Sequence, residues 1–311
     1  MNQHIAIMER EVVEALRAAD PAVKRLIDGT VGGGGHTLAL LRAGIDEALG
    51  MDLDESAIAQ ANARLAEFGE RVSLVHRSYT TMADAASALG WQAVDAILLD
   101  LGLSSLQLDD KARGFSFRFD APLDMRFDRD HDETTAQDLV NNLPAADLAG
   151  LLFRYGEERQ ARRIAGAIVE RRPIQTTRQL AELVARVKAR PARGSARIHP
   201  ATRVFQALRI AVNGELDALE RVLPIAVDLL RQGGRLAVIS FHSLEDRIVK
   251  QSFKALSTSR VAPPGMASIG QRVARVSLVN RKPISPTEEE VKANPRSRSA
   301  KLRVVEKLEW A

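Results

Sequence analysis

A run of glycines between an acid and a histidine is the first feature of the sequence that could do chemistry. It reads Asp28-Gly-Thr-Val-Gly-Gly-Gly-Gly-His36 and follows a short apolar run. Consecutive glycines let the backbone approach a ligand closely and adopt positive φ. The spacing does not fit the dinucleotide fingerprint G-x-G-x-x-G, and the Gly-Lys-Ser/Thr of a P-loop is missing. An acid at a strand end directly before such glycines is instead typical of an S-adenosylmethionine site.

A second acid, Asp52, ends the next apolar run, 24 residues after Asp28. A carboxylate at this place can accept hydrogen bonds from both ribose hydroxyls of an adenosyl cofactor. The neighbouring Asp54 is better placed to cap the helix that follows. We therefore assign the ribose role to Asp52.

A third acid, Asp100, ends the most apolar run of the chain and opens the segment Asp100–Asp109 (DLGLSSLQLD). The nucleophilic elbow G-x-S-x-G is excluded, because Leu106 stands where the second glycine is needed. The segment is either part of a functional site or a solvated turn at a strand end.

Several other residues have both a functional and a structural interpretation. His242 lies between a predicted strand and a helix that Ser243 and Asp246 would cap. It either supports the local fold or faces the substrate. We favour the second, because the strand before it is expected to end at the edge of the sheet where the catalytic residues lie. Arg296 and Arg298 contact either phosphates or the C-terminal part of the fold.

Aromatic and acidic clusters follow the third acid. Phe115, Phe117 and Phe119 alternate among arginines, which suits either a stacking surface for a displaced base or a half-buried strand. The segment Asp128–Asp132 begins like a calcium loop, but the positions that need Gly and Glu hold Glu133 and Leu139. We expect no metal site.

Apolar runs alternate with helical patterns in the first third of the chain. The predicted strands are Lys24–Asp28, Glu47–Asp52, Arg71–His76 and Ala93–Asp100, and the predicted helices are 8–20, Thr37–Ala43, Glu55–Phe68 and Met82–Leu89. This alternation predicts parallel βαβ units in a doubly wound α/β sheet. Ligands of such sheets bind beyond the carboxyl ends of the strands, which is where the three acids fall.

A mainly helical segment interrupts this alternation. Residues Ala136–Arg190 have a helical pattern, with turns at Leu143-Pro144, Arg172-Pro173 and Arg190-Pro191. A long helical stretch, Ala201–Leu230, is then expected to break near Asn213-Gly214 or Pro224. The strands Gly234–Phe241, Arg275–Asn280 and Lys301–Leu308, the helix Ser243–Ser257 and a loop over 260–272 complete the prediction. We expect one discontinuous domain, 1–109 and 201–311, with an insertion at 110–200.

The composition is that of a globular chain, with 45% hydrophobic and 27% charged residues in 311. Because the chain has no cysteine, disulfides, thiolate metal sites and cysteine nucleophiles are excluded. No apolar run approaches the roughly 20 residues of a membrane helix, and the N-terminus lacks the apolar stretch of a signal peptide. We therefore expect a cytoplasmic protein.

The net charge of +4 is unevenly distributed. Between Phe153 and Arg209 there are 14 Lys or Arg and 4 Glu, so the rest of the chain is acidic. Such a block is expected either of a protein with a phosphate-rich partner or of a solvated helical face. Arg outnumbers Lys 35 to 9, which suits bidentate phosphate contacts.

Seven motifs in order resemble those of the bacterial ribosomal RNA small subunit methyltransferase H (MraW-like) family. They are Asp28–His36, Asp100–Asp109, Arg113–Met125 (RGFSFRFDAPLDM), Tyr155–Arg159 (YGEER), His199–Arg209 (HPATRVFQALR), Ser240–Arg247 (SFHSLEDR) and Asn294–Arg303 (NPRSRSAKLR). The resemblance runs from about His4 to Arg303. It implies a Rossmann-like class I S-adenosylmethionine-dependent methyltransferase fold.

The resemblance implies methylation of the exocyclic N4 of one cytidine in the decoding region, at the P site, of 16S rRNA. The residues that it places on S-adenosylmethionine are Gly33, Gly34, Gly35, His36, Asp52, Tyr79, Asp100 and Gln107. The lone pair of N4 is delocalised into the ring, so a hydrogen-bond acceptor near the amino group would help the reaction. Asp100 is our candidate for this role, although it could instead hold the cofactor, and His242 is a second catalytic candidate.

The expected partner is 16S rRNA within the small ribosomal subunit, with no DNA and no membrane, and the protein is expected to be a monomer or a homodimer. Candidate RNA contacts are Arg113, Arg126, Arg162, Arg163, Arg171, Arg172, Arg203, Arg247, Arg296 and Arg298. Two other classes of protein have the same fold class. A nicotinamide oxidoreductase is disfavoured by the glycine spacing, and a non-catalytic RNA-binding factor by the presence of every expected cofactor residue.

Overall fold

The computed structural model divides the chain into two compact units and describes residues 6–19, 23–104, 107–108, 110–130, 132–188, 199–259 and 273–309. The first unit comprises Met1–Gly102 and Leu216–Ala311, and the second comprises Leu103–Glu215. The second unit is therefore longer at both ends than the insertion expected at 110–200. The last helix of the stretch, α10 (Thr202–Asn213), packs against α7 (Ala145–Gly156) of the same unit.

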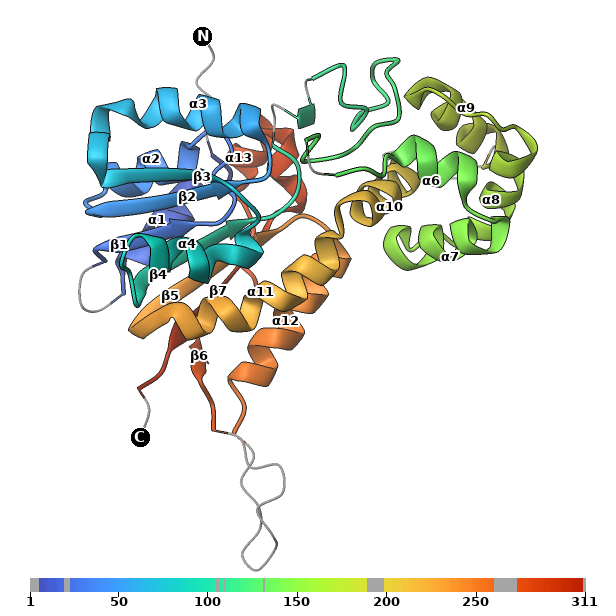
Figure 1. Ribbon diagram of the computed structural model, residues 1–311. Helices are drawn as coiled ribbons and strands as arrows, with labels where there is room; N and C mark the ends of the chain where they lie inside the picture. The colour runs from blue at the N-terminus through green and yellow to red at the C-terminus, as the bar shows by residue number, and fades with distance from the viewer. Residues whose placement is uncertain are drawn as a thin grey trace, which may run out of the picture. The chain divides into compact units, whose positions relative to one another are not determined.

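The first unit is built on a seven-stranded sheet with the order β3-β2-β1-β4-β5-β7-β6 (Figure 1). The strands are β1 (Arg25–Asp28), β2 (Glu47–Asp52), β3 (Val72–His76), β4 (Val94–Asp100), β5 (Leu230–Ser240), β6 (Val276–Leu278) and β7 (Lys301–Lys307). Strands β1 to β5 pair in parallel, and β7 is antiparallel to both β5 and β6. Each predicted strand and the doubly wound α/β sheet are confirmed.

Helices cover both faces of this sheet because its strands are apolar on both faces. Leu26, Ala48 and Leu98 pack in one core cluster with α1 (Glu9–Arg17), α2 (Gly35–Arg42) and α3 (Glu55–Leu65). Ile27 and Leu49 belong to the other cluster, with α4 (Met82–Ala88), α11 (Glu215–Leu229) and α12 (Ser243–Leu256). Successive side chains of a strand point to opposite faces, so adjacent apolar residues enter different clusters.

The predicted break in the stretch Ala201–Leu230 occurs at Gly214. Its φ of +58° is a left-handed conformation that glycine adopts without strain, and it ends α10. Pro224 lies inside α11 without ending it. The alternative of a break at Pro224 is therefore wrong.

The second unit has its own core. Its helices are α6 (Ala136–Asn142), α7, α8 (Ala161–Glu170), α9 (Thr177–Val187) and α10. The helices α6 and α9 begin with capping boxes at Thr135 and Thr176, which satisfy backbone N–H groups of the first turn. Among the described residues of this unit, the one β-contact is an isolated bridge between Pro122 and Thr176.

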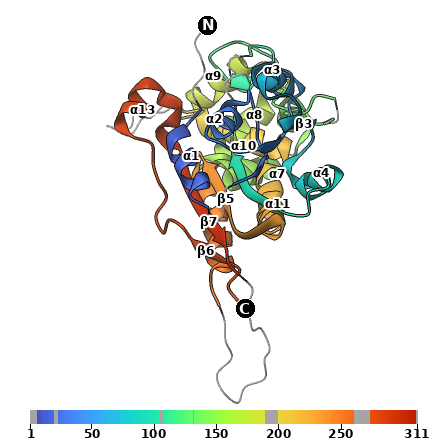
Figure 2. The ribbon, with the colours of Figure 1, turned by 90° about the vertical axis from the view of Figure 1, so that its left-hand side faces the viewer.

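The C-terminal elements complete the first unit. Figure 2 shows α13 (Glu288–Ala293) beside α1, where the backbone N–H of Met8 donates to Oε1 of Glu290 at 2.8 Å. A short 3₁₀ helix, η3 (Pro295–Ser299), precedes β7. Across the ranges that the structure describes, no helix has the length and apolar character needed to span a membrane. The predicted loop at 260–272 and the turn at Arg190-Pro191 lie outside those ranges.

Candidate active site

The acids Asp28, Asp52 and Asp100 end three parallel strands at one edge of the sheet, as predicted. The strands β2 and β4 both pair with β1, so Asp28 stands opposite Gly50 on one side and Leu98 on the other. The chain that leaves β1 is fixed to both neighbours, because Gly29 N–H donates to the carbonyl of Leu98 and Val31 N–H to that of Met51. This edge is where a sheet of this kind binds its ligand.

The glycine loop needs glycine at particular positions. Gly32 and Gly34 have φ of +50° and +76°, a range that L side chains rarely adopt. A Cβ on Gly34 would lie 3.3 Å from the Cα of Ala61 in α3. The loop is thus held close to a neighbouring helix and leads directly into the N-terminus of α2.

Asp28 is an internal anchor of this loop. Its side chain is 1% exposed and accepts hydrogen bonds from Oγ1 of Thr37 (2.7 Å) and from the backbone N–H of Thr30 (3.2 Å). Burial raises the pKa of the carboxyl group, while nearby His36 and the bonds from the two threonines lower it. Thr30 and Thr37 were not among the predicted site residues, although an acid two residues before Thr30 is a recognisable turn signal.

Asp52 joins the glycine loop to the start of α3. Its Oδ2 accepts from Gly32 N–H and its Oδ1 from Asp54 N–H, both at 2.9 Å. Burial raises the pKa of Asp52 to about 6, against the effect of these two bonds. Each carboxylate oxygen has a second lone pair, so both can still accept a ligand hydroxyl. The prediction that Asp54 caps α3 is confirmed, since its carboxylate accepts from Ser56 N–H.

Asp100 is flanked by a threonine and a histidine. Its backbone N–H donates to Oγ1 of Thr30, and its Oδ2 lies 3.6 Å from Nδ1 of His36. Its Oδ1 is buried and has no hydrogen-bond partner among the described residues. Burial raises the pKa of Asp100 to about 7; the charges of Asp28 and Glu245 raise it further, and His36 lowers it.

Comparison with known proteins agrees with the resemblance seen in the motifs. The MraW methylase family matches residues 1–308. The chain belongs to this family. Two relatives, from Geobacter sp. (strain M21) and Citrifermentans bemidjiense, are each 50% identical over 311 residues, which is 98% of this chain and 98% of the relative. Both carry the name ribosomal RNA small subunit methyltransferase H, as does a 46% identical relative from Lawsonia intracellularis that is covered to 99%.

As a member of the MraW methylase family the chain is a methyltransferase, and its methyl donor is S-adenosylmethionine. The first unit fits this donor. Asp52 keeps acceptor capacity for ribose hydroxyls, Oδ1 of Asp100 is an unused buried acceptor, and Gly32, Gly33 and Gly35 of the loop are partly exposed.

Replacing Asp52 with Ala is expected to weaken binding of S-adenosylhomocysteine by roughly 1.5–3 kcal/mol, because charge-assisted hydrogen bonds to the ribose are lost. Calorimetry measures this. Asp54→Asn is the matched control, since it removes a neighbouring charge but keeps a capping side chain. A folded Asp52→Ala protein with wild-type affinity would contradict the assignment.

The other two expected cofactor residues, Tyr79 and Gln107, lie in different units of the chain. Tyr79 begins the 3₁₀ helix η2 (Tyr79–Thr81), and its Cβ lies 3.0 Å from where a Cβ on Gly29 would be. It therefore stands beside the loop that leaves β1. Gln107 belongs to the second unit, where its Oε1 accepts from the backbone N–H of Ser104.

His242 is used as a helix cap. Its Nδ1 accepts from Glu245 N–H at 3.3 Å, and its Nε2 lies 3.1 Å from Oε1 of Glu245. The other carboxylate oxygen of Glu245 accepts from the N–H groups of Phe241 and His242. The expected capping role of Ser243 and Asp246 is wrong, because Asp246 binds Lys301 and Arg303 instead. Nε2 of His242 is buried and has no hydrogen-bond partner among the described residues. The structure thus shows a capping role through Nδ1, and the catalytic role of His242 stays a prediction.

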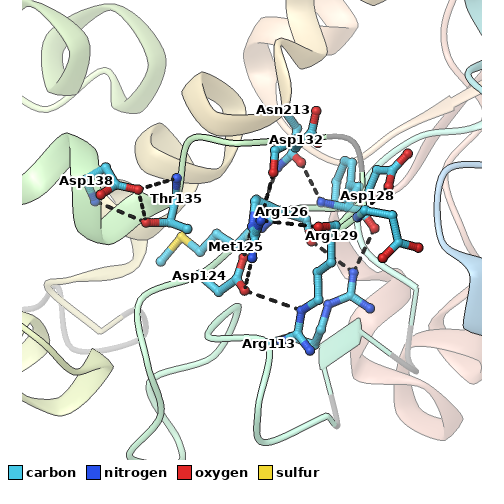
Figure 3. A network of polar contacts seen from close by, with 12 residues as sticks. Arg113, Asp124, Met125, Arg126, Asp128, Arg129, Asp132, Thr135, Asp138 and Asn213 are labelled. Atoms are coloured by element: carbon cyan, nitrogen blue, oxygen red, sulfur yellow. Dashed lines mark hydrogen bonds and ion pairs between the residues drawn. The ribbon is translucent and has the colours of Figure 1, made fainter.

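Two arginines expected to bind RNA are structural (Figure 3). Arg113 is 6% exposed, and its Nη2 donates to the carbonyls of Arg126 and Phe127. Arg126 forms two hydrogen bonds to the carboxylate of Asp124 and another to the carbonyl of Asp132. Their donors shape the loop before α6, so these two assignments are corrected.

Other arginines divide between structural and exposed positions. Arg172 donates to the carbonyls of Val140 and Leu143, which fixes it between segments of its own unit. Arg203 is exposed but donates to the carbonyl of Glu157. The exposed candidates that remain are Arg162, Arg163, Arg171, Arg247 and Arg298, with Arg296 partly exposed.

The aromatic run forms no strand, and two of its three rings pack inside the second unit. Phe115 is 6% exposed and its ring centroid is 5.6 Å from that of Phe127. Phe117 packs against Phe205 and His199. Phe115 and Phe117 belong to the core of the second unit, so a stacking role for these two rings is corrected. Phe119 is partly exposed beneath Lys111, and its stacking role stays a prediction.

Proposed function

We propose that this methylase transfers the methyl group of S-adenosylmethionine to the exocyclic N4 of one cytidine in the decoding region, at the P site, of 16S rRNA. The names of its relatives, ribosomal RNA small subunit methyltransferase H, support the ribosomal substrate. The observation that carries the chemistry is the unused buried acceptor of Asp100 at the end of β4. The substrate implies a cytoplasmic protein, which acts as a monomer or a homodimer.

The proposed reaction requires positioning and an acceptor for positive charge. When bound, the cofactor supplies a methyl group on a positively charged sulfur, so the protein has only to align nitrogen, carbon and sulfur. Positive charge develops on N4 as it attacks. A carboxylate of Asp100 within hydrogen-bond distance of the amino group would stabilise this charge more in the transition state than before it.

The remaining residues of the proposed cofactor site bind and orient. Asp52 would accept the ribose hydroxyls, and Gly33, Gly34, Gly35 and His36 would present backbone and the N-terminus of α2. Tyr79 stands beside the same loop. Gln107 remains part of the proposal on the family resemblance.

The RNA is proposed to bind a surface around the turn between α7 and α8. We call it the α7–α8 surface and define it by Phe153, Arg154, Arg159, Arg162 and Arg163, all of which are exposed. Of the two acids in this turn, Glu158 is 2% exposed and paired with Lys188. The surface therefore holds four exposed arginines and one partly exposed acid, Glu157, and this excess of positive charge suits phosphates.

Phe153 is expected to stack on an RNA base. It is 67% exposed, and it lies on the same surface as four exposed arginines and next to Arg154 in the chain. Base stacking on an aromatic ring is worth about 1–3 kcal/mol. We expect Phe153→Leu to bind small-subunit RNA roughly tenfold more weakly and Phe153→Trp to bind like the wild type. Wild-type binding by the Leu variant would contradict the stacking role.

The reaction itself is tested on small ribosomal subunits from a strain that lacks the modification. Incubation with the protein and labelled S-adenosylmethionine, followed by nucleoside mass spectrometry, should yield N4-methylated cytidine at one position. Label in another base, or in no RNA at all, would overturn the proposal.

A further inference from the structure

We propose that His36 and Asp100 form a proton-holding pair, in which His36 takes up through Asp100 the proton that leaves the methylated amino group. This inference rests on the proposed function for the identity of the amino group. It assigns His36, expected so far only to line the cofactor site, a role as a positioning residue for the proton.

The contact between His36 and Ile7 fixes the tautomer of His36. The ring is 6% exposed, and its Nε2 lies 2.9 Å from the carbonyl oxygen of Ile7. A carbonyl oxygen can only accept, so Nε2 must carry hydrogen. In the neutral ring the lone pair is then on Nδ1, the nitrogen that faces Asp100.

Nδ1 of His36 and Oδ2 of Asp100 need a proton between them. The Nδ1 atom and Oδ2 of Asp100 are 3.6 Å apart, with the His36 side chain 7% and the Asp100 side chain 23% exposed. A neutral Nδ1 and a carboxylate are both acceptors, and two acceptors this close in a largely buried place repel. One proton, on either group, turns the contact into attraction.

Negative charges lie near the pair formed by His36 and Asp100. Asp28 at the end of β1 and Glu245 of α12 both act on Asp100 as negative charges. They favour the retention of a proton by the pair, in agreement with the raised pKa of Asp100. The pair is thus set between holding and releasing one proton near neutral pH.

The two carboxylate oxygens of Asp100 have different surroundings. Oδ2 faces His36, and Oδ1 has no partner among the described residues. In the reaction the N4 lone pair forms the bond to the methyl carbon, and the sulfur–carbon bond breaks with its electron pair left on sulfur. N4 is then a cationic secondary amine and gives one proton to Oδ1. The carboxyl group formed in this way turns about its Cβ–Cγ bond so that its O–H faces His36, and it passes this same proton to Nδ1, which leaves an imidazolium beside a carboxylate.

His36→Gln separates this role from a structural one. The amide nitrogen of Gln can still donate to the carbonyl of Ile7, but the variant has no basic Nδ1. Single-turnover methylation at saturating cofactor should slow by about tenfold or more, and its rise with pH should move to higher pH, because His36 lowers the pKa of Asp100. Saturating cofactor separates this effect on the rate from any change in cofactor affinity, which calorimetry with S-adenosylhomocysteine measures. His76→Gln is the matched control, since Nε2 of His76 lies 2.8 Å from the carbonyl of Leu53 in a similar contact.

A second measurement does not depend on activity. Nitrogen NMR of histidine-labelled protein, with the signal of His36 identified by its loss in His36→Gln, should show hydrogen on Nε2 and proton uptake at Nδ1. Asp100→Asn should shift that uptake. Hydrogen on Nδ1 at every pH, or uptake unaffected by Asp100→Asn, would overturn the inference. Asp100→Asn could shift proton uptake at Nδ1 of His36 while the wild type methylates no cytidine. In that case the proposed function fails and the proton-holding pair stands.

Discussion

Asp100→Asn is expected to lower the methyl-transfer rate by roughly 10²-fold or more, the size of one electrostatic contact made mainly in the transition state. Asn has nearly the same shape and keeps one acceptor oxygen, but it has no charge and cannot take a proton. The hydrogen bond from Asp100 N–H to Thr30 involves the backbone, so it survives the change. Single-turnover methylation at saturating cofactor measures the rate.

The alternative role gives a different result. If Asp100 only anchors the cofactor, Asp100→Asn should raise the cofactor KM and leave kcat at saturation nearly intact. A pure effect on KM would therefore contradict the catalytic role. Asp84→Asn, on the exposed face of α4, is the control for loss of one negative charge.

The pH dependence gives a second check on the same residue. The pKa of Asp100 is raised to about 7, mainly by burial and also by Asp28 and Glu245, while His36 lowers it. The carboxylate is the active form, so kcat/KM for the cofactor should rise as pH increases through about 7 and level off above it. Asp100→Asn should remove this rise.

The sheet could be predicted because its strands carry a strong signal. Each parallel strand is a short apolar run that ends at a polar residue, and Asp28, Asp52 and Asp100 mark the ends of three of them. Strands buried on both faces are apolar throughout, and turns punctuate them sharply. The position of the candidate site followed from this pattern, since the carboxyl ends of parallel strands share one edge.

The fate of individual arginines could not be predicted. In the sequence, Arg113 and Arg172 look like Arg162, since all three are arginines among other basic residues. Their guanidinium groups nevertheless donate to backbone carbonyls of segments that are separate in the sequence. Those carbonyls come close only after the second unit folds. Sequence spacing cannot distinguish an arginine whose guanidinium group donates to buried backbone carbonyls from an arginine that faces solvent.

Unit boundaries were missed for a similar reason. The helix α10 follows the insertion directly and was assigned to the sheet-bearing unit. It packs on α7 at Gly156, where an added Cβ would lie 2.6 Å from the carbonyl oxygen of Arg203. A small residue that permits close helix packing gives no signal of its own in one sequence.

Neutralising the α7–α8 surface is expected to weaken binding of small-subunit RNA by roughly 10²-fold at 0.1 M salt and to flatten its salt slope by up to about 3. The variant changes Arg154, Arg159, Arg162 and Arg163 to Gln. Each phosphate contact releases condensed counterions, so the loss of four contacts lowers both affinity and its dependence on salt. Titrations at several salt concentrations measure both quantities.

The position of Arg162 and Arg163 argues against a purely structural role for this surface. They lie in the first turn of α8, which has no acidic residue. Cations there oppose the helix dipole by about 0.3–1 kcal/mol, so their removal should not destabilise the helix. The control changes an equal number of exposed cations of the first unit, Arg17, Arg42, Arg221 and Lys254, to Gln. If both variants change the salt slope equally, the effect is one of net charge, and the α7–α8 surface is only a solvated helical face.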